Sequence, residues 1–345
     1  MKIHSVRILQ AIFYSVLLSL CITSCKKAEN PVKFPLGSFP DSTIALEDLN
    51  SQYDDLEITN IDLVIDDTDP ETHQLFGNII LIISSNRTSL GEQYDPIQGQ
   101  LNFNWDQTNG DFGLECNITQ DAFLTKLINA VITAGDDLGP YRRVSTLDGY
   151  EYLILSSENE NGDLDLYYFK NQPILGSGLP EIAGPFPVQL LNSSADDKYV
   201  CMDTDMDTLY FSSDRSGNFD ILMKRRPAAT NITDWFNSPY ESSLPLDSIN
   251  SQYDDVCPMV CRDILVFASN RPGGMGGYDL YYSLFKNGKW NSPVNFGPKI
   301  NTQYDEYRPV LGSHIDFTNN FIVFSSNRPG GKGLFDLYFA GVSIK

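Results

Sequence analysis

Residues 269–283 read SNRPGGMGGYDLYYS, and this stretch decides the fold because related copies of it recur along the chain. Each copy begins where an apolar run ends in a turn of the Ser-Ser-Asn-Arg type. The five turns end at Arg87, Asn159, Arg215, Arg271 and Arg328, which lie 72, 56, 56 and 57 residues apart. An Asp then opens a second alternating segment, as in Tyr278-Asp279-Leu280-Tyr281. Several short strands in a repeat of roughly 50 residues are typical of one blade of a β-propeller.

An acidic turn precedes four of the five copies. Its members are Asp54-Asp55, Asp196-Asp197, Asp254-Asp255 and Asp305-Glu306. In the second copy we align Tyr141 with this motif, so that Arg142-Arg143 stands where the other copies have two acids. Each unit therefore predicts an acidic turn followed by strands, the fourth of which lies around Trp235 or Trp290 in its copy.

The ends of the chain predict how the ring closes. The last copy stops at Lys345 after its third strand, and residues 41–50 (DSTIALEDLN) resemble the tail of a unit. We therefore predict an all-β, five-bladed propeller in which the N-terminal segment supplies the missing outer strand and leaves no open sheet edge. A sixth, degenerate blade within residues 96–135 is the alternative. Apolar residues at helical spacing in residues 121–133 (DAFLTKLINAVIT) predict a short helical insertion in blade one.

These units resemble TolB-like propeller repeats, a WD-like family. Residues 269–283 and 326–338 (SNRPGGKGLFDLY) match that pattern closely, and the other units match it more loosely. The resemblance covers nearly all of the chain after residue 40. It implies a propeller that serves as an interaction module in the bacterial periplasm, although a fold alone does not determine a function.

The N-terminus resembles a bacterial lipoprotein signal. A basic start and a short apolar run end in Ile22-Thr23-Ser24-Cys25. The resemblance implies removal of residues 1–24 and lipidation of Cys25, with palmitate among the acyl chains; an uncleaved anchor is the alternative. Residues 25–40 would then form a Pro-rich tether, and residues 41–345 a single propeller domain. We expect a lipid-anchored protein of the bacterial cell envelope, at the outer membrane, that faces either the periplasm or the cell surface.

Composition excludes several function classes. Asp and Glu total 45 against 24 Lys and Arg, a formal net charge of −21. A protein that binds a phosphate backbone needs a basic face, so we expect no nucleic-acid partner. With three His and no metal-ligand spacing, we expect neither a metal nor a cofactor. Cys201 is a candidate to form a disulfide with Cys257 or Cys261 in an oxidising compartment.

Most of the motif residues have a structural explanation. We expect bidentate ion pairs across the repeated turn. The pairs are Arg87/Asp95, Arg215/Asp220, Arg271/Asp279 and Arg328/Asp336. The acidic turns either cap backbone N–H groups in every blade or ring one mouth of the central channel, where they would attract a cation or a basic peptide. The ligand-binding candidates from these turns are Asp54, Asp55, Asp254, Asp255, Asp305 and Glu306.

Specific recognition in a repeated ring must come from residues that are not repeated. Such departures cluster in blades one and two, and they include an acidic insertion at residues 62–76. Arg142 and Arg143 put positive charge where the other copies are negative. We expect an anionic or glycan ligand to bind there, with Trp105 as a stacking surface.

Two hypotheses follow for the function. The first is a non-catalytic, monomeric envelope lipoprotein whose propeller binds an envelope protein or a glycan, and which contacts the membrane through its lipid anchor alone. The alternative is a glycan-active hydrolase or lyase that uses channel carboxylates. That chemistry needs two unique carboxylates, one of them with a raised pKa. The repeats offer no such pair, so we expect a binding protein rather than an enzyme.

Overall fold

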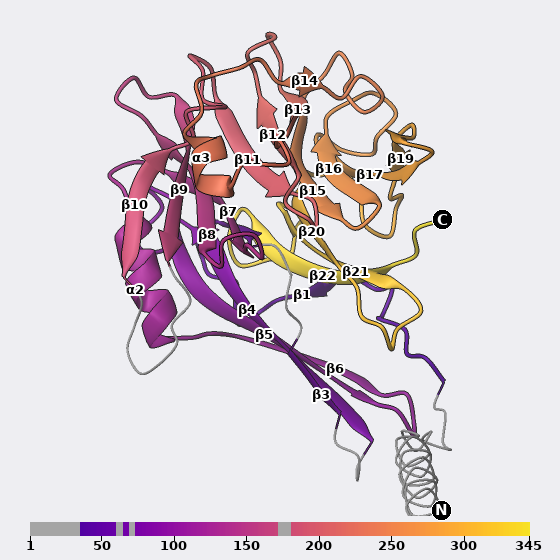
Figure 1. Ribbon diagram of the computed structural model, residues 1–345. Coiled ribbons are helices and arrows are strands. Elements are labelled where there is room, and N and C mark those ends of the chain that lie inside the picture. Colours follow the sequence, from indigo (N-terminus) through magenta and orange to yellow (C-terminus); the bar gives the residue numbers. More distant parts are fainter. Residues whose placement is uncertain (1–34, 60–64, 69–72, 172–180) are drawn as a thin grey trace, which may run out of the picture. The chain divides into compact units, whose positions relative to one another are not determined.

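Five antiparallel sheets make up this computed structural model, which describes residues 35–59, 65–68, 73–171 and 181–345 (Figure 1). Blade one contains β2 (Asp55–Ile58), β3 (Ile65–Thr68), β4 (Gln74–Ser85), β5 (Asp95–Asp106) and β6 (Phe112–Ile118). Blade two contains β7 (Asp137–Val144), β8 (Glu151–Glu158), β9 (Leu164–Asn171) and β10 (Ile182–Pro187). Blade three contains β11 (Asp197–Met202), β12 (Thr208–Ser213), β13 (Asp220–Arg225) and β14 (Leu244–Pro245).

The last two blades follow the same order. Blade four contains β15 (Asp255–Cys261), β16 (Ile264–Ser269), β17 (Asp279–Lys286), β18 (Lys289–Trp290) and β19 (Val294–Asn295). Blade five contains β20 (Glu306–Gly312), β21 (Asn320–Ser326), β22 (Asp336–Val342) and, from the N-terminal segment, β1 (Ile44–Ala45). The innermost strands are β2, β7, β11, β15 and β20, and each contacts the innermost strands of both neighbouring blades. The predicted five-bladed propeller is therefore confirmed.

The ring closes as the sequence predicts. In β1, Ile44 pairs with Phe339 of β22 and Ala45 pairs with Tyr338, so the N-terminal segment is the outer strand of the last blade. No sixth blade forms in the described residues, because residues 95–118 are taken up by the two outer strands of blade one, β5 and β6.

The folded unit begins earlier than expected. Residues 25–40 were predicted to form a tether, but the compact unit runs from Leu36 to Lys345. Phe39 is almost fully buried, and its ring stacks on Phe317 with a centroid distance of 3.8 Å. Burying a Phe side chain contributes about 1.5–3 kcal/mol, enough to hold this short segment in place. The signal peptide and Cys25 lie outside the described residues.

Helix α2 (Ala122–Val131) confirms the predicted helical insertion in blade one. The Asp121 carboxylate caps it by accepting the N–H groups of Phe123 and Leu124, both at 2.9 Å. The apolar face of α2 packs on Ile82 of blade one and Leu153 of blade two, so the helix seals the seam between these blades. None of the helices in the described part of the chain is both long and apolar enough to span a bilayer.

Two further expectations change. Trp235 lies in a second helix, α3 (Ile232–Phe236), rather than in a strand; the outer strand of blade three is β14. The insertion at residues 62–76 falls partly outside the described residues, and its described part extends blade one. There β3 pairs with β4, and the β4–β5 ladder runs from Ser85↔Asp95 out to Gln74↔Asp106 (Figure 1).

The repeated arginines pair with a different carboxylate from the expected one. Arg87 forms its ion pair with Asp55, the second acid of the acidic turn, and not with Asp95. The other blades repeat this contact: Arg215–Asp197, Arg271–Asp255 and Arg328–Glu306. The expected partners Asp95, Asp220, Asp279 and Asp336 instead accept hydrogen bonds from their own turns, through Thr88, Ser216, Met275 and Gly333.

The direction of the arginine side chain explains this difference. Arg87 Nε donates to Ser85 Oγ at 3.0 Å, which turns the guanidinium back toward the innermost strand, where it also reaches the carbonyl of Leu49. Each arginine therefore joins the end of the second strand to the start of the first strand of the same blade.

Candidate functional site

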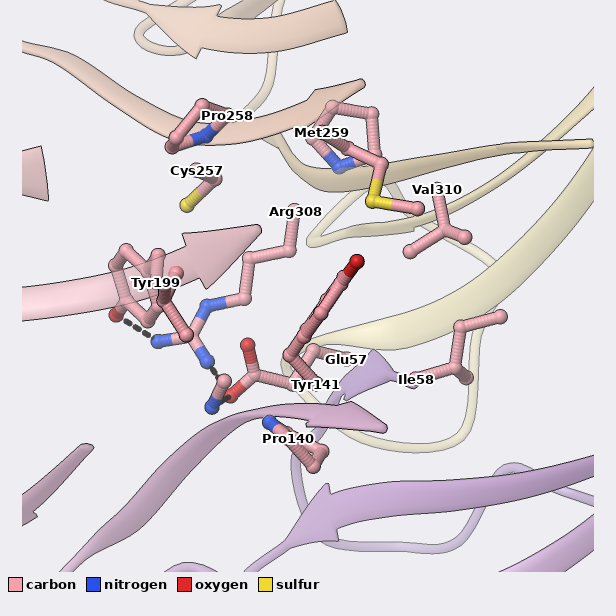
Figure 2. A pocket seen from close by; sticks show the side chains of 13 residues that line it. Glu57, Ile58, Pro140, Tyr141, Tyr199, Cys257, Pro258, Met259, Arg308 and Val310 are labelled. Atoms are coloured by element: carbon pink, nitrogen blue, oxygen red, sulfur yellow. Dashed lines mark hydrogen bonds and ion pairs between the residues drawn. The ribbon is translucent and has the colours of Figure 1, made fainter. Parts of the chain in front are cut away.

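The five innermost strands bring one position of the repeat together in a single pocket, which we call the central pocket (Figure 2). This position lies two residues after the second acid of each turn. It holds Glu57, Gly139, Tyr199, Cys257 and Arg308. The five blades are equivalent at this position in structure but different in chemistry. Because the five residues differ, this position can give the pocket specificity for a ligand.

A local distortion of the strand marks the same position. The pairing register of each innermost strand shifts there, as at a β-bulge. Tyr199, Cys257 and Arg308 have φ values of 59°, 56° and 50°, a left-handed conformation that costs about 1–3 kcal/mol for a residue other than Gly. Hydroxyls of the neighbouring blade hold the bulge: Ser212 Oγ accepts the N–H of Cys257 at 3.0 Å.

Arg308 connects the polar groups of the central pocket. Its Nη1 forms an ion pair with Glu57, and its Nη2 donates to the hydroxyl of Tyr199 (Figure 2). The backbone N–H of Gly139 also donates to Glu57, at 2.5 Å. Because Glu57 accepts from both a guanidinium and a backbone N–H, its ionised form is stabilised.

One donor in this set lacks an acceptor. Arg308 is only 6% exposed, and its guanidinium lies 4.2 Å from the centroid of the Tyr199 ring. Its Nε is buried and has no hydrogen-bond partner among the described residues. A buried donor without an acceptor is unfavourable, so an oxygen atom of a ligand at this place would be stabilised.

Three polar groups in or beside the central pocket, those of Tyr199, Tyr307 and Cys257, are neutral at physiological pH. Burial raises the pKa of Tyr199 and of Tyr307 well above the ordinary value, so both phenols stay protonated. Burial likewise raises the pKa of the Cys257 thiol, which leaves it a poor nucleophile. Among the residues that line the pocket, Glu57 and Arg308 are the charged pair.

The size of the central pocket limits what can enter it. Its volume is about 50 Å³, which is room for a few water-sized groups. A water molecule and one substituent of a larger ligand would fit, whereas a whole sugar ring would have to remain outside.

The acidic turns make the same contacts in every blade. Each first acid accepts a backbone N–H from the blade before it: Asp54 from Phe335, Asp254 from Phe219 and Asp305 from Tyr278, at distances between 2.8 and 3.0 Å. Each second acid is fully buried, as Asp55, Asp255 and Glu306 show. These contacts join neighbouring blades and cap turns; cation or peptide binding by these carboxylates stays a prediction.

The proposed symmetry break in blade two rests on a wrong alignment. Asp136 and Asp137 are its acidic pair, because Asp136 accepts the N–H of Tyr94 at 2.9 Å, as Asp54 does with Phe335. Arg142 and Arg143 lie farther along β7, where the other copies have no acidic turn. The alignment of Tyr141 with the tyrosine before the acids is therefore wrong, because it shifts the register of blade two by several residues.

The three ligand candidates of blades one and two do not form one surface. Arg142 pairs with Glu151 and packs on Phe123, and Arg143 donates to the carbonyl of Thr204 at 2.8 Å. Trp105 is 4% exposed and packs against Phe317, so it offers no stacking surface. The N-terminal segment covers the Trp105 side chain: a Cβ at Gly37 would lie 2.8 Å from its ring.

Blade two lacks the arginine that the other blades use. Thr133 takes its place: its N–H and its hydroxyl donate to the Asp137 carboxylate at 2.8 and 3.1 Å. Burial, without a guanidinium to offset it, raises the pKa of Asp137 to about 6. Asn159, which stands where the arginine would be, donates to Asp165 within its own turn.

Metal and disulfide chemistry find no support in the described residues. No group of three or more His, Cys, Asp or Glu side chains is placed there to hold a metal ion. Within the described ranges, no disulfide joins Cys116, Cys201, Cys257 or Cys261.

The sequence predictions do not include the central pocket, because they rest on residues that the blades share, whereas the residues of this pocket differ from blade to blade. Aligning the five copies on the second acid of the turn and reading two positions on would have shown Glu57, Gly139, Tyr199, Cys257 and Arg308 in one column. A column of unlike residues inside an otherwise regular motif is the signal that marks this position.

No family model and no curated protein matches this chain. Among solved structures, it is similar to an endo-arabinase from Bacteroides thetaiotaomicron, at 12% identity and a TM-score of 0.46, over 91% of this chain and 99% of that one. It is also similar to a thermostable family-43 glycoside hydrolase, at 13% identity and a TM-score of 0.47, over 92% of this chain and 93% of that one. The similarity to RS223-β-xylosidase has 8% identity and a TM-score of 0.46, over 88% of this chain and 95% of that one. At such identities the similarity concerns the fold alone.

These comparisons correct two predictions. The resemblance to TolB-like repeats is contradicted, because the structurally similar proteins include several family-43 glycoside hydrolases. The expectation of a non-catalytic scaffold is contradicted by the same finding, because these proteins are enzymes. The alternative hypothesis, a glycan-active hydrolase, is retained, and its argument comes from the pocket of this chain.

Proposed function

We propose that this chain is a glycan-active hydrolase whose reaction centre is the central pocket. The observation that carries the proposal is the column of five unlike residues that meet there. It places one buried carboxylate, Glu57, beside a buried guanidinium, Arg308, whose Nε has no partner among the described residues. Pockets with a few convergent polar groups are the usual place for ligand binding and chemistry in proteins.

Glu57 is assigned the role of the base. In hydrolysis a base takes a proton from water as the water oxygen bonds the anomeric carbon, the bond from that carbon to the leaving oxygen breaks, and the leaving oxygen takes up a proton. Glu57 is the one carboxylate among the residues that line the central pocket, so the leaving oxygen would take its proton from solvent at the mouth of the pocket rather than from a second carboxylate. Arg308 and the N–H of Gly139 favour the ionised form of Glu57, which is the form that accepts a proton. The volume of about 50 Å³ suits the attacking water and one sugar hydroxyl, while the rest of the glycan would lie across the mouth of the pocket.

Arg308 and Tyr199 are assigned to binding. The unpartnered Nε of Arg308 would donate to a sugar oxygen, and the ring of Tyr199 offers an apolar face beside a hydroxyl. Such a mixture of apolar faces and hydrogen-bonding groups suits a sugar, which has both C–H faces and hydroxyl groups.

The test is hydrolysis by the wild type and by Glu57→Gln. Arabinan, xylan and β-1,3-galactan serve as substrates, and the release of reducing ends is the measurement. Glu57→Gln keeps the size of the side chain but removes the base, so kcat should fall by about 100-fold or more while KM changes little. Glu92→Gln, on an exposed turn of blade one, is the matched control and should match the wild type. Absence of hydrolysis of all three polymers by the wild type, or full activity in Glu57→Gln, would overturn the proposal.

We also propose that Cys25 carries a lipid that anchors a monomeric chain in the bacterial cell envelope, at the outer membrane. The support is the short apolar run that ends in Ile22-Thr23-Ser24-Cys25. Cells that express the chain would be grown with an alkynyl analogue of palmitate. The label should appear on the wild type and on Cys261→Ser, and should be lost in Cys25→Ser; a labelled Cys25→Ser chain would contradict the assignment.

A further inference from the structure

A second groove lies on the extended sheet of blade one and shares no residue with the central pocket. We call it the blade-one groove. Its volume is about 480 Å³, within the range typical of small-ligand sites. Its lining includes Phe76 and Asn78 of β4, Asn102 and Asn104 of β5, and Glu115 of β6.

Strand register arranges these residues in two rows. Asn78 pairs with Asn102, and Asn102 pairs with Glu115, so one row crosses all three strands. In the second row Phe76 pairs with Asn104. Residues two apart on a strand share a face, so both rows lie on the same side of the sheet, about 7 Å apart.

The groups of these rows are partly unsatisfied. Asn78 Oδ1 is buried and has no hydrogen-bond partner among the described residues, and Phe76 is 46% exposed although it is a large apolar side chain. Gly113 leaves space for an amide: a Cβ there would lie 2.0 Å from Asn104 Oδ1. The groove therefore combines an open aromatic face with amide groups that can still bond a ligand.

We propose that the blade-one groove binds a neutral oligosaccharide. Hydroxyl groups donate and accept hydrogen bonds, and so do the three amides, while Glu115 accepts and Phe76 packs on an apolar sugar face. No Lys, Arg or His is among the lining residues, which disfavours a phosphate, sulfate or uronate. A peptide that adds a strand needs a sheet edge, but these groups lie on the face. The inference rests on the proposed function, because the blade-one groove would bind the same class of molecule, a glycan, that the central pocket hydrolyses.

The test measures binding of xylohexaose, arabinohexaose and cellohexaose to the full chain by isothermal titration calorimetry. Phe76→Ala and Asn102→Ala should each weaken the binding of at least one hexasaccharide about tenfold. Because Phe76 is half exposed, its removal leaves the core intact, which separates loss of binding from loss of folding. Asn117→Ala is the matched control, because this exposed Asn lies on the same sheet, in β6, but outside the groove. The Asn117→Ala variant should bind the hexasaccharides with the affinity of the wild type.

Two results would overturn the inference: no heat of binding with any of the three hexasaccharides, or unchanged affinity in both Phe76→Ala and Asn102→Ala. Tighter binding of a sulfated hexasaccharide than of its neutral form would also contradict it. Its failure is distinguishable from that of the proposed function, because Glu57→Gln should abolish hydrolysis and retain hexasaccharide binding. Phe76→Ala should weaken that binding about tenfold, and calorimetry measures this loss without depending on hydrolysis.

Discussion

Replacing Asp137 with Asn should change how the stability of this protein depends on pH. Burial raises the pKa of Asp137 to about 6 from an ordinary value of 3.8, and no arginine offsets that burial as in the other four blades. The folded state therefore holds the proton more tightly than the unfolded state does. Stability contributed by this group is complete below about pH 4 and is lost as the pH rises through about 6.

The magnitude follows from the two pKa values. The difference between 6 and 3.8 corresponds to at most about 3 kcal/mol at neutral pH, of which about 1 kcal/mol is lost between pH 5 and pH 7. Burial also raises the pKa of Asp165, Asp220, Glu306 and Asp336, so the whole protein has a pH dependence that one curve cannot assign. Comparison with Asp137→Asn cancels those shared contributions.

The assay is urea unfolding, followed by tryptophan fluorescence, at about pH 5 and about pH 7. Between these two values the wild type should lose about 1 kcal/mol more free energy of unfolding than Asp137→Asn loses. Asp205→Asn removes an exposed carboxylate and should follow the wild type. Equal losses in the wild type and in Asp137→Asn, or a smaller loss in the wild type, would refute the reasoning.

Two other predictions concern the contacts that close each blade and the ring. Arg271→Ala should lower the free energy of unfolding by about 3–5 kcal/mol, because it leaves the fully buried carboxylate of Asp255 without its partner. Lys286→Ala, which removes an exposed cation, is the control and should leave the melting temperature nearly unchanged. A similar loss of stability in both variants would contradict the pairing of Arg271 with Asp255. Phe39→Ala should destabilise the protein by about 3–5 kcal/mol, because its ring lies among five other phenylalanines. The exposed Leu36→Ala is the control, and a native-like urea midpoint in Phe39→Ala would show that this segment does not hold the ring.

Much of the fold could be read from the sequence because the signals are local. Turn motifs and alternating apolar residues predicted the blades, and the helical spacing of apolar residues in residues 121–133 predicted α2. The match of residues 41–50 to the tail of a unit predicted the closing strand, which Ile44 and Ala45 form. These signals need no knowledge of distant contacts.

Side-chain partners were harder to predict. Arg87 lies eight residues before Asp95 but pairs with Asp55, because its side chain runs back across the sheet. The acidic pair of blade two, Asp136 and Asp137, was overlooked because a tyrosine was used to set the register. In both cases closeness in sequence was the wrong guide to closeness in space.

The ring of five blades is predictable from the repeats, since the turns and strands of each blade lie within one repeat. Which side chains share a site depends instead on contacts between residues far apart in the chain. Glu57 and Arg308 stand 251 residues apart and contact each other because the first and last innermost strands become neighbours when the ring closes. The blade-one groove likewise exists only because the register of β4, β5 and β6 aligns Asn78, Asn102 and Glu115 on one face.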